Sequence, residues 1–456
     1  MNTSRRIAMA AALLLAAASP LSAQTGLTIY NSGRVLVRRT LPVAVPKGAS
    51  DQRVSLGTLD PATLFALDPA VSILSATYDG GTDLQSTLRR AIGRELLFVR
   101  EPMMGREKGD TVRATLLAVD PERYRYADGS VGFQAPGMPR FPADLVIVDP
   151  SVRLSLKSAQ ALPTLGLGYF TGGADWQASY QVILAGANAR VTGTAVVQSS
   201  TLSVSEADLQ LLAGDVGVAQ NDQAAYKRGV PMAAMAMEAG PATEQRIGEA
   251  HLYTVPGKVT LRPGQTSMLA LFEPASAPVA KRLVVRSGIP YWGDLPQYGG
   301  AQEVPVAVTY VVSRALKTPF GDTPVPGGVA RIYQKDDAGR LQLIGESGLG
   351  HTAAGQPLEL NAGTAFDLTA KRTQTTYASS RDKNGRVTAT ADYSVALANA
   401  TDSAATVDVY EERGGDWSVL QSSVPAEKVS STRTRFRVTV PAKGETTLTY
   451  RIRATW

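Results

Sequence analysis

The chain has 456 residues, 44% of them hydrophobic and 19% charged, which is enough for about two to four domains with sizeable cores. It contains no cysteine, which excludes disulfides, thiolate nucleophiles and cysteine-bound zinc. Two histidines leave few ligands for a His-rich metal site, and a net charge of +6 is too small at this length to indicate nucleic-acid binding. Composition therefore excludes several kinds of chemistry, and no cofactor is predicted.

The first 23 residues have the pattern of a secretory signal peptide. Arg5 and Arg6 precede an apolar run at 7–18, and small residues at 19–23 form an acceptable cleavage site. The run is too short to span a bilayer comfortably, and no later stretch is long and apolar enough for a transmembrane helix. We therefore expect an exported chain and predict the periplasm as its location, with the outer membrane or the cell exterior as alternatives.

Period-two alternation broken by Gly, Pro, Asn and Asp runs through the remaining chain and predicts an all-β, multidomain protein of antiparallel sandwiches. The N-terminal region, 24–160, begins with a predicted hairpin at 27–41 and a strand at 71–78. One short helix is expected at 83–92, with Asp83 or Thr82 as its cap. Five short apolar runs between 94 and 150, the last at 145–148, predict a small closed barrel of SH3-like or OB-like kind.

Two further domains are expected after residue 160. A central β-sandwich at 161–315 should contain a hairpin over 176–197 and a mobile loop rich in Met and Ala at 220–248. A Pro-rich passage marks a junction, after which six or seven strands at 316–456 predict an immunoglobulin-like β-sandwich.

Several segments, in the same order, resemble landmarks of domain-of-unknown-function family 4139 (DUF4139). They are WQASY at 176–180, LQLLAGDV at 209–216, HLYTV at 251–255, PGGVARIY at 326–333 and the closing stretch 415–456. Some members of the family are called mucoidy-inhibitor-like proteins, so the resemblance implies a bacterial envelope setting and a link to surface polysaccharide. The family supplies no established reaction, cofactor or catalytic residue. Residues 24–160 resemble only the variant with a small barrel in front.

One candidate metal site lies in and after the expected loop. Thioethers are soft ligands that favour Cu(I), and an exported protein can meet copper. The candidate ligands are Met232, Met235, Met237 and His251. The alternative is a linker rich in Ala and Met that binds no metal.

The last two strands carry the clearest surface pattern. Apolar residues alternate with basic ones, so a hairpin of these strands would have an apolar face and a shared arginine face. That face would carry Arg433, Arg435, Arg437, Arg451 and Arg453. Guanidinium groups could bind phosphates or uronates of envelope glycans there. The alternative is a solvated sheet face with acidic neighbours on adjoining strands.

These patterns favour a non-catalytic binding or structural module of the cell envelope, whose partner would be an envelope protein or an anionic glycan. An envelope polysaccharide hydrolase is one alternative, with Asp175 and Asp215 as a conceivable acid pair and Ser347 near His351 as a weaker motif. A protein associated with an outer-membrane β-barrel is another, because apolar alternation runs up to the terminal Trp456. No catalytic residue is predicted, and the oligomeric state is left open.

Overall fold

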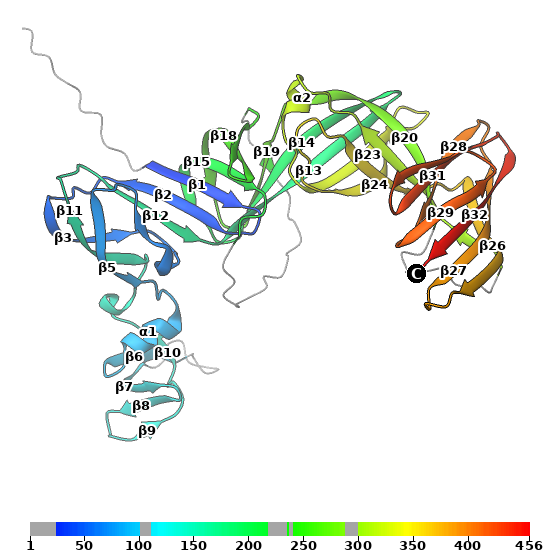
Figure 1. Ribbon diagram of the computed structural model, residues 1–456. Coiled ribbons are helices and arrows are strands. Elements are labelled where there is room, and N and C mark those ends of the chain that lie inside the picture. Colours follow the sequence, from blue (N-terminus) through cyan, green and yellow to red (C-terminus); the bar gives the residue numbers. More distant parts are fainter. Residues whose placement is uncertain (1–23, 101–110, 218–234, 237–239, 288–299) are drawn as a thin grey trace, which may run out of the picture. The chain divides into compact units, whose positions relative to one another are not determined.

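The computed structural model describes residues 24–100, 111–217, 235–236, 240–287 and 300–456, without the side chains of 235–236. The all-β prediction is confirmed, since β-strands, most of them paired antiparallel, make up nearly all of the regular structure. The chain divides into two compact units (Figure 1). Unit 1 contains residues up to 28, 34–173 and 204–208, and unit 2 contains 29–33, 174–203 and 209–456.

Unit 1 contains two sheets besides its small subdomain. One has the order β1 (Gln24–Tyr30), β2 (Val35–Leu41), β12 (Leu165–Thr171) and β4 (Phe65–Ala66), and the 3-10 helix η1 (Pro61–Thr63) precedes β4. The other has the order β3 (Gly48–Ser55), β11 (Ser151–Ser158) and β5 (Val71–Asp79). The opening hairpin and the strand at 71–78 are as predicted.

Alternation along β11 decides which side chains of the three-stranded sheet are buried. Val152, Leu154 and Leu156 point to the core and are at most 1% exposed. Arg153 and Lys157, one residue out of phase, are exposed on the other face.

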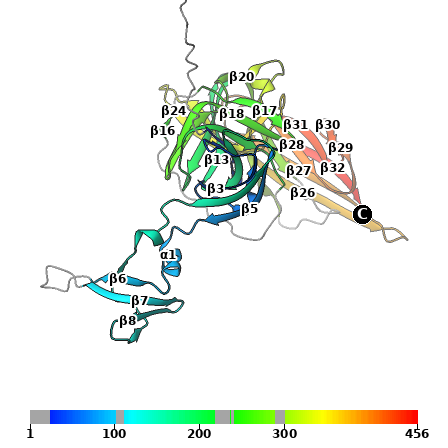
Figure 2. The ribbon, with the colours of Figure 1, turned by 90° about the vertical axis from the view of Figure 1, so that its left-hand side faces the viewer.

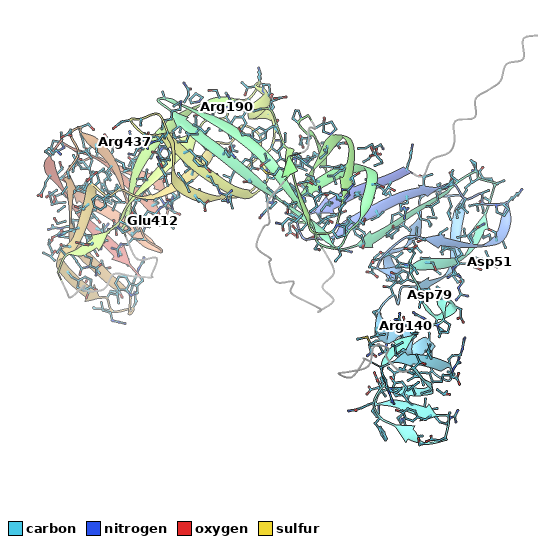
Figure 3. All side chains as sticks on the ribbon, turned by 180° about the vertical axis from the view of Figure 1, so that it is seen from behind. Asp51, Asp79, Arg140, Arg190, Glu412 and Arg437 are labelled. Atoms are coloured by element: carbon cyan, nitrogen blue, oxygen red, sulfur yellow. The ribbon has the colours of Figure 1, made fainter. Side chains whose placement is uncertain are left out.

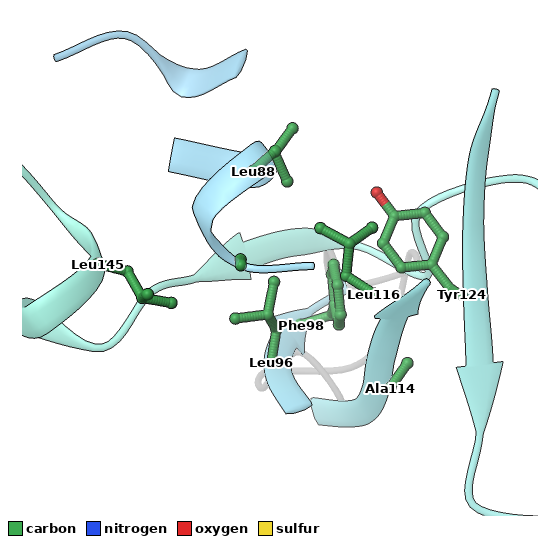
Figure 4. Packing of buried hydrophobic residues seen from close by; sticks show 8 residues of the cluster. Leu88, Leu96, Phe98, Ala114, Leu116, Tyr124 and Leu145 are labelled. Carbon is green, nitrogen blue, oxygen red and sulfur yellow. The ribbon is translucent and has the colours of Figure 1, made fainter. Parts of the chain in front are cut away.

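The small subdomain of unit 1 is a five-stranded sheet with one helix, α1 (Leu84–Arg90). Figure 2 shows α1 beside this sheet. Its strand order is β10 (Met138–Arg140), β6 (Glu95–Val99), β7 (Thr111–Val119), β8 (Glu122–Tyr126) and β9 (Val131–Gly132). A core of side chains from the helix, the sheet and a following turn holds it together (Figure 4). These are Leu88, Ala91, Leu96, Phe98, Ala114, Leu116, Tyr124 and Leu145.

Three expectations for this subdomain need correction. Over the described residues the sheet stays open, so the predicted closed barrel is not found. The apolar run at 145–148 is no strand: η2 (Ala143–Leu145) lies there and only Leu145 is buried. The helix expected at 83–92 covers only Leu84–Arg90, although Asp83 caps it as predicted, accepting from Ser86 N at 2.9 Å.

The largest sheet belongs to unit 2 and has the order β24-β23-β13-β14-β20-β28-β31-β30. Its last four strands are β20 (Ala275–Ser287), β28 (Ala405–Glu412), β31 (Arg433–Val440) and β30 (Ala426–Ser430). β13 (Ala174–Ala185) and β14 (Asn188–Ser199) form the predicted hairpin. β23 (Gly328–Lys335) pairs in parallel with β13 and antiparallel with β24 (Leu341–Leu349). Strands on both sides of the expected domain boundary at residue 316 therefore share one sheet.

Strands from the region of the expected loop also belong to sheets. β17 (Thr243–Ile247) pairs with β18 (Ala250–Leu261), which lies beside β15 (Val204–Ala213). β16 (Met235–Ala236) pairs with β19 (Gln265–Ala270), which in turn pairs with β14. The prediction of a loop up to residue 248 is therefore wrong for 235–236 and 243–247.

The segment between the two sandwich regions is held by a buried arginine. Arg314 donates to the carbonyl oxygens of Phe320, Thr323, Ala353 and Gln356, and burial lowers its pKa. These bonds fix the short helix α2 (Pro319–Asp322) and the turn that follows β24. The Pro-rich passage at 319–326 is thus an ordered part of unit 2.

The C-terminal residues form a sandwich of two sheets. One side comes from the largest sheet: β20 (Ala275–Ser287), β28 (Ala405–Glu412), β31 (Arg433–Val440) and β30 (Ala426–Ser430). β22 (Val306–Val312) joins β20, and β25 (Leu358–Thr364) joins β22. The other sheet has the order β21 (Gln302–Val304), β26 (Leu368–Arg381), β27 (Val387–Asn399), β32 (Gly444–Thr455) and β29 (Asp416–Ser422).

Aromatic stacking joins the two sheets of this sandwich. The rings of Phe436 in β31 and Tyr450 in β32 stack with centroids 4.8 Å apart, and Tyr393 in β27 stacks on Tyr450 at 5.5 Å. The inward-facing alternate residues of both sheets therefore form one core. Among the helices that the structure describes, none is long and apolar enough to cross a membrane.

Candidate functional site

The two strands that carry the predicted arginine face lie in different sheets. β31 pairs with β28 and β30, whereas β32 pairs with β27 and β29. The prediction of a hairpin with one shared arginine face is therefore wrong. Its physical reason is the core: Phe436 and Tyr450 stack against each other across the sandwich, so the alternate basic residues of the two strands point outward on opposite sides.

On the outer face of β31, each arginine forms an ion pair. Arg433 lies 2.8 Å from Glu412, Arg435 lies 2.5 Å from Glu427, and Arg437 lies 3.2 Å from Asp408 (Figure 3 labels Arg437 and Glu412). The hydrogen bond from Arg435 also lowers the pKa of Glu427. An anionic ligand at this face would have to displace these carboxylates.

On the outer face of β32, Arg451 has an acidic partner as well. Its Nε and Nη2 donate to the two carboxylate oxygens of Asp392 at 2.5 and 2.9 Å, and Thr376 donates to the same carboxylate at 2.6 Å. The hydrogen bond from Arg451, followed by that from Thr376, lowers the pKa of Asp392. This pair is bidentate, the geometry in which arginine binds carboxylates most strongly.

Arg453 is the fifth arginine and has a different environment. It is exposed, and its register partners are Thr390 on β27 and Ser418 on β29. Within the described parts of the chain it forms no ion pair. The outward positions nearest to it carry the hydroxyl side chains of Thr388, Thr390, Ser418 and Thr455 and two acids, Asp392 and Asp416, which pair with Arg451 and Arg386.

Charged side chains also lie inside the sandwich. Glu411 is fully buried between Arg372 and Arg413, which are 4% and 2% exposed. Its carboxylate lies 3.2 Å from Arg372 and 2.8 Å from Arg413, and Tyr450 donates its hydroxyl to Glu411 Oε2 at 2.6 Å. Ser287 donates to the same oxygen at 3.3 Å. We call Arg372, Glu411, Arg413, Tyr393 and Tyr450 the buried ionic cluster.

The buried ionic cluster links the two sheets of the sandwich. Glu411 comes from β28, whereas Arg372, Tyr393 and Tyr450 come from the opposite sheet. The Arg372 guanidinium lies over the Tyr393 ring at 3.7 Å, and burial raises the pKa of the Tyr450 hydroxyl, which therefore stays a donor. The charged and hydroxyl groups of the cluster pair with one another, so we assign the cluster a structural role.

Sequence reasoning missed this cluster, although the alternation of the strands contains a signal for it. Glu411 is in phase with the buried Val407 and Val409, and Arg372 is in phase with Leu368 and Ala370. Charged residues in an inward phase are expected to pair with each other. Which residues pair could not be predicted, because the pairing depends on how two sheets stack.

The copper hypothesis mostly concerns side chains outside the described residues. Met232 and Met237 lie outside them, and Met235 is described only as backbone in β16. His251 lies in β18, where its Nδ1 is 2.7 Å from Glu244 Oε1. Among the described residues, no group of three His, Asp or Glu side chains is placed to hold a metal ion. The copper site stays a prediction.

The residues considered for hydrolase chemistry lie on separate elements. Asp175 in β13 is the register partner of Gln198, and Asp215 is exposed after the end of β15. Ser347 Oγ accepts from Asn361 N at 3.0 Å, and His351 Nδ1 accepts from Gly327 N at 3.1 Å. Both groups bind backbone amides of other segments, and within the described chain neither bonds to the other.

No family model matches the chain, and no curated protein matches its sequence. The resemblance to domain-of-unknown-function family 4139 stays a prediction.

Proposed function

We propose that this protein is an exported module of a bacterial cell envelope that binds an anionic polysaccharide through the outer face of its C-terminal five-stranded sheet. The observation that carries the proposal is Arg453, an exposed guanidinium that forms no ion pair within the described residues and has Thr390 and Ser418 as its register partners. The signal-peptide pattern of the first 23 residues and the resemblance to an envelope family support the setting.

The chemistry of this face suits a uronate-bearing glycan. A guanidinium binds a carboxylate through two parallel hydrogen bonds. It binds a ligand carboxylate less strongly when a carboxylate of the protein is already paired with it. Thr390 and Ser418, beside Arg453, can donate to and accept from sugar hydroxyls. The β31 arginines have the same charge but already pair with acids, which makes them weaker candidates.

The experiment is a calorimetric titration of the mature chain, residues 24–456, with a defined oligogalacturonate. We expect saturable binding that Arg453→Gln weakens about tenfold or more, as loss of a charged hydrogen-bond pair would. Arg437→Gln is the matched control, because Arg437 is also exposed but lies on the other outer face and pairs with Asp408. Equal affinities of wild type and Arg453→Gln, or absence of binding, would contradict the proposal.

A further inference from the structure

A second group of basic side chains lies on the outer face of the three-stranded sheet of unit 1. Arg53 in β3 and Arg153 in β11 are direct register partners, so their side chains leave the sheet on the same face, side by side. Both are exposed. Lys157, also exposed, lies on the same face of β11 four residues further along.

Like charges directly opposite each other on a sheet destabilise the pairing, so a cross-strand pair of arginines needs an explanation. The acidic residues of the face do not supply one. Asp51 accepts a hydrogen bond from Ser155, and Asp79 is the register partner of Ser151, so the two acids lie on opposite edge strands (Figure 3). Within the described residues neither acid forms an ion pair with Arg53 or Arg153.

One of the two guanidiniums is held in position. Arg53 donates from Nε and Nη2 to Ser151 Oγ at 3.2 and 3.1 Å, and Ser151 is itself 8% exposed. Ser151 lies two residues from Arg153 on β11, on the side away from Asp51. The Arg53 side chain therefore points away from Asp51 and towards β11, the strand that carries Arg153.

The third strand completes a polar surface around the pair. The residue of β5 opposite Arg153 is Thr77, and the residue opposite Ser155 is Ser75; both are exposed. Two guanidiniums and nearby hydroxyl groups match a phosphate group, which offers several oxygens to planar donors and carries more charge than a carboxylate. The hydroxyl groups of Thr77 and Ser75 suit a sugar phosphate better than an acyl chain.

We propose that the outer face of the β3-β11-β5 sheet binds a phosphate group carried on an envelope glycan, between Arg53 and Arg153. The bound phosphate would remove the repulsion between the two guanidiniums, and Lys157 would contribute long-range attraction to further anionic groups of the same glycan. This site lies in unit 1 and does not depend on the Arg453 face.

The experiment is a calorimetric titration of the mature chain with mannose 6-phosphate and, in parallel, with mannose. We expect binding of the phosphorylated sugar only, weakened about tenfold or more by Arg153→Gln and by Arg53→Gln, and less by Arg153→Lys, which keeps the charge. Arg113→Gln is the matched control, because Arg113 is an exposed arginine of the same unit that already pairs with Glu95 at 2.9 Å.

Further measurements separate the outcomes. Because Arg153→Gln removes a like-charge contact, we expect its unfolding midpoint in phosphate-free buffer to equal or exceed that of the wild type, so a loss of binding would not reflect misfolding. Arg453→Gln should bind mannose 6-phosphate like the wild type, which keeps this proposal distinct from the uronate proposal. Equal affinity for mannose, unchanged binding by both Arg53→Gln and Arg153→Gln, or binding only to vesicles of anionic phospholipid would overturn it.

Discussion

At the scale of single residues, the molecule shows how strongly the position of an arginine decides its role. Arg372 and Arg413 lie in the core with one carboxylate, Arg451 forms a bidentate surface pair, and Arg453 is exposed among hydroxyl groups. A buried arginine that loses its carboxylate partner is left as an unpaired charge without water, which is strongly destabilising. An arginine at the surface that loses its partner is solvated by water, so the cost is small.

Glu411→Gln tests the buried ionic cluster. The substitution leaves two buried guanidiniums without their counter-charge, so we expect it to lower the free energy of unfolding by about 3–5 kcal/mol. Its sequence neighbour offers a matched control: Glu412 points outward and pairs with Arg433 and Arg286, so Glu412→Gln should cost less than about 1 kcal/mol. Denaturant titration of both variants measures this, and similar losses for the two would contradict the assignment.

Asp392 gives a prediction for pH. Its pKa is lowered in the folded protein, chiefly by the hydrogen bond from Arg451, so its contribution to stability is present above the pKa of the unfolded chain, about 3.9. That contribution is lost as the pH falls through the lower, folded pKa. We expect Asp392→Asn to cost about 1 kcal/mol at pH 7 and progressively less below about pH 4.

Urea titrations of wild type and Asp392→Asn at pH 7, 5 and 3 measure that difference. Asp402→Asn is the control, because Asp402 is 95% exposed and pairs with Lys443 on the surface. A cost of Asp392→Asn that grows on acidification would have the wrong sign.

At the scale of elements, close backbone packing fixes the parallel pair β13 and β23. A Cβ built on Gly328 would lie 2.1 Å from the carbonyl oxygen of Ala178, its register partner, so Gly328→Ala must push the strands apart. We expect a loss of about 1–3 kcal/mol in unfolding free energy, as for other overpacked sites.

Gly348→Ala is the matched control for that prediction, because a Cβ at Gly348 meets nothing within 4 Å and Gly348 lies on the next strand, β24. We expect its unfolding midpoint to stay near the wild-type value or to rise slightly. Equal destabilisation by the two substitutions would show that chain stiffness, and not close contact, determines the effect.

Elements with clear local signals were predictable from the sequence, and pairings between distant elements were not. The turn between β13 and β14 and the cap Asp83 depend on neighbouring residues alone. The last two strands were predicted in the right places and phase, but their pairing was wrong. Alternation shows which side of each strand is apolar, but it does not say whether two such sides lie next to each other in one sheet or face each other across a core.

At the scale of the molecule, the placement of the last two strands in different sheets divides the predicted surface of five arginines and leaves Arg453 as the one candidate for ligand binding. Three of those arginines lie on the outer face of one sheet and two on that of the other, and four of the five have an acidic partner. The copper-ligand hypothesis and the predicted signal peptide concern residues mostly outside the described chain. The proposed envelope setting therefore depends on sequence pattern, and the proposed binding face depends on the fold.

The central claim, binding of an anionic envelope polysaccharide, can be tested most directly in living cells. The tagged protein is crosslinked in place and purified, and the captured material is analysed for protein by mass spectrometry and for uronic acids by sugar analysis. We predict near-stoichiometric uronate glycan with the wild type and with Arg437→Gln, and a large loss with Arg453→Gln. Capture of no glycan by the wild type, or equal capture by Arg453→Gln, would contradict the account.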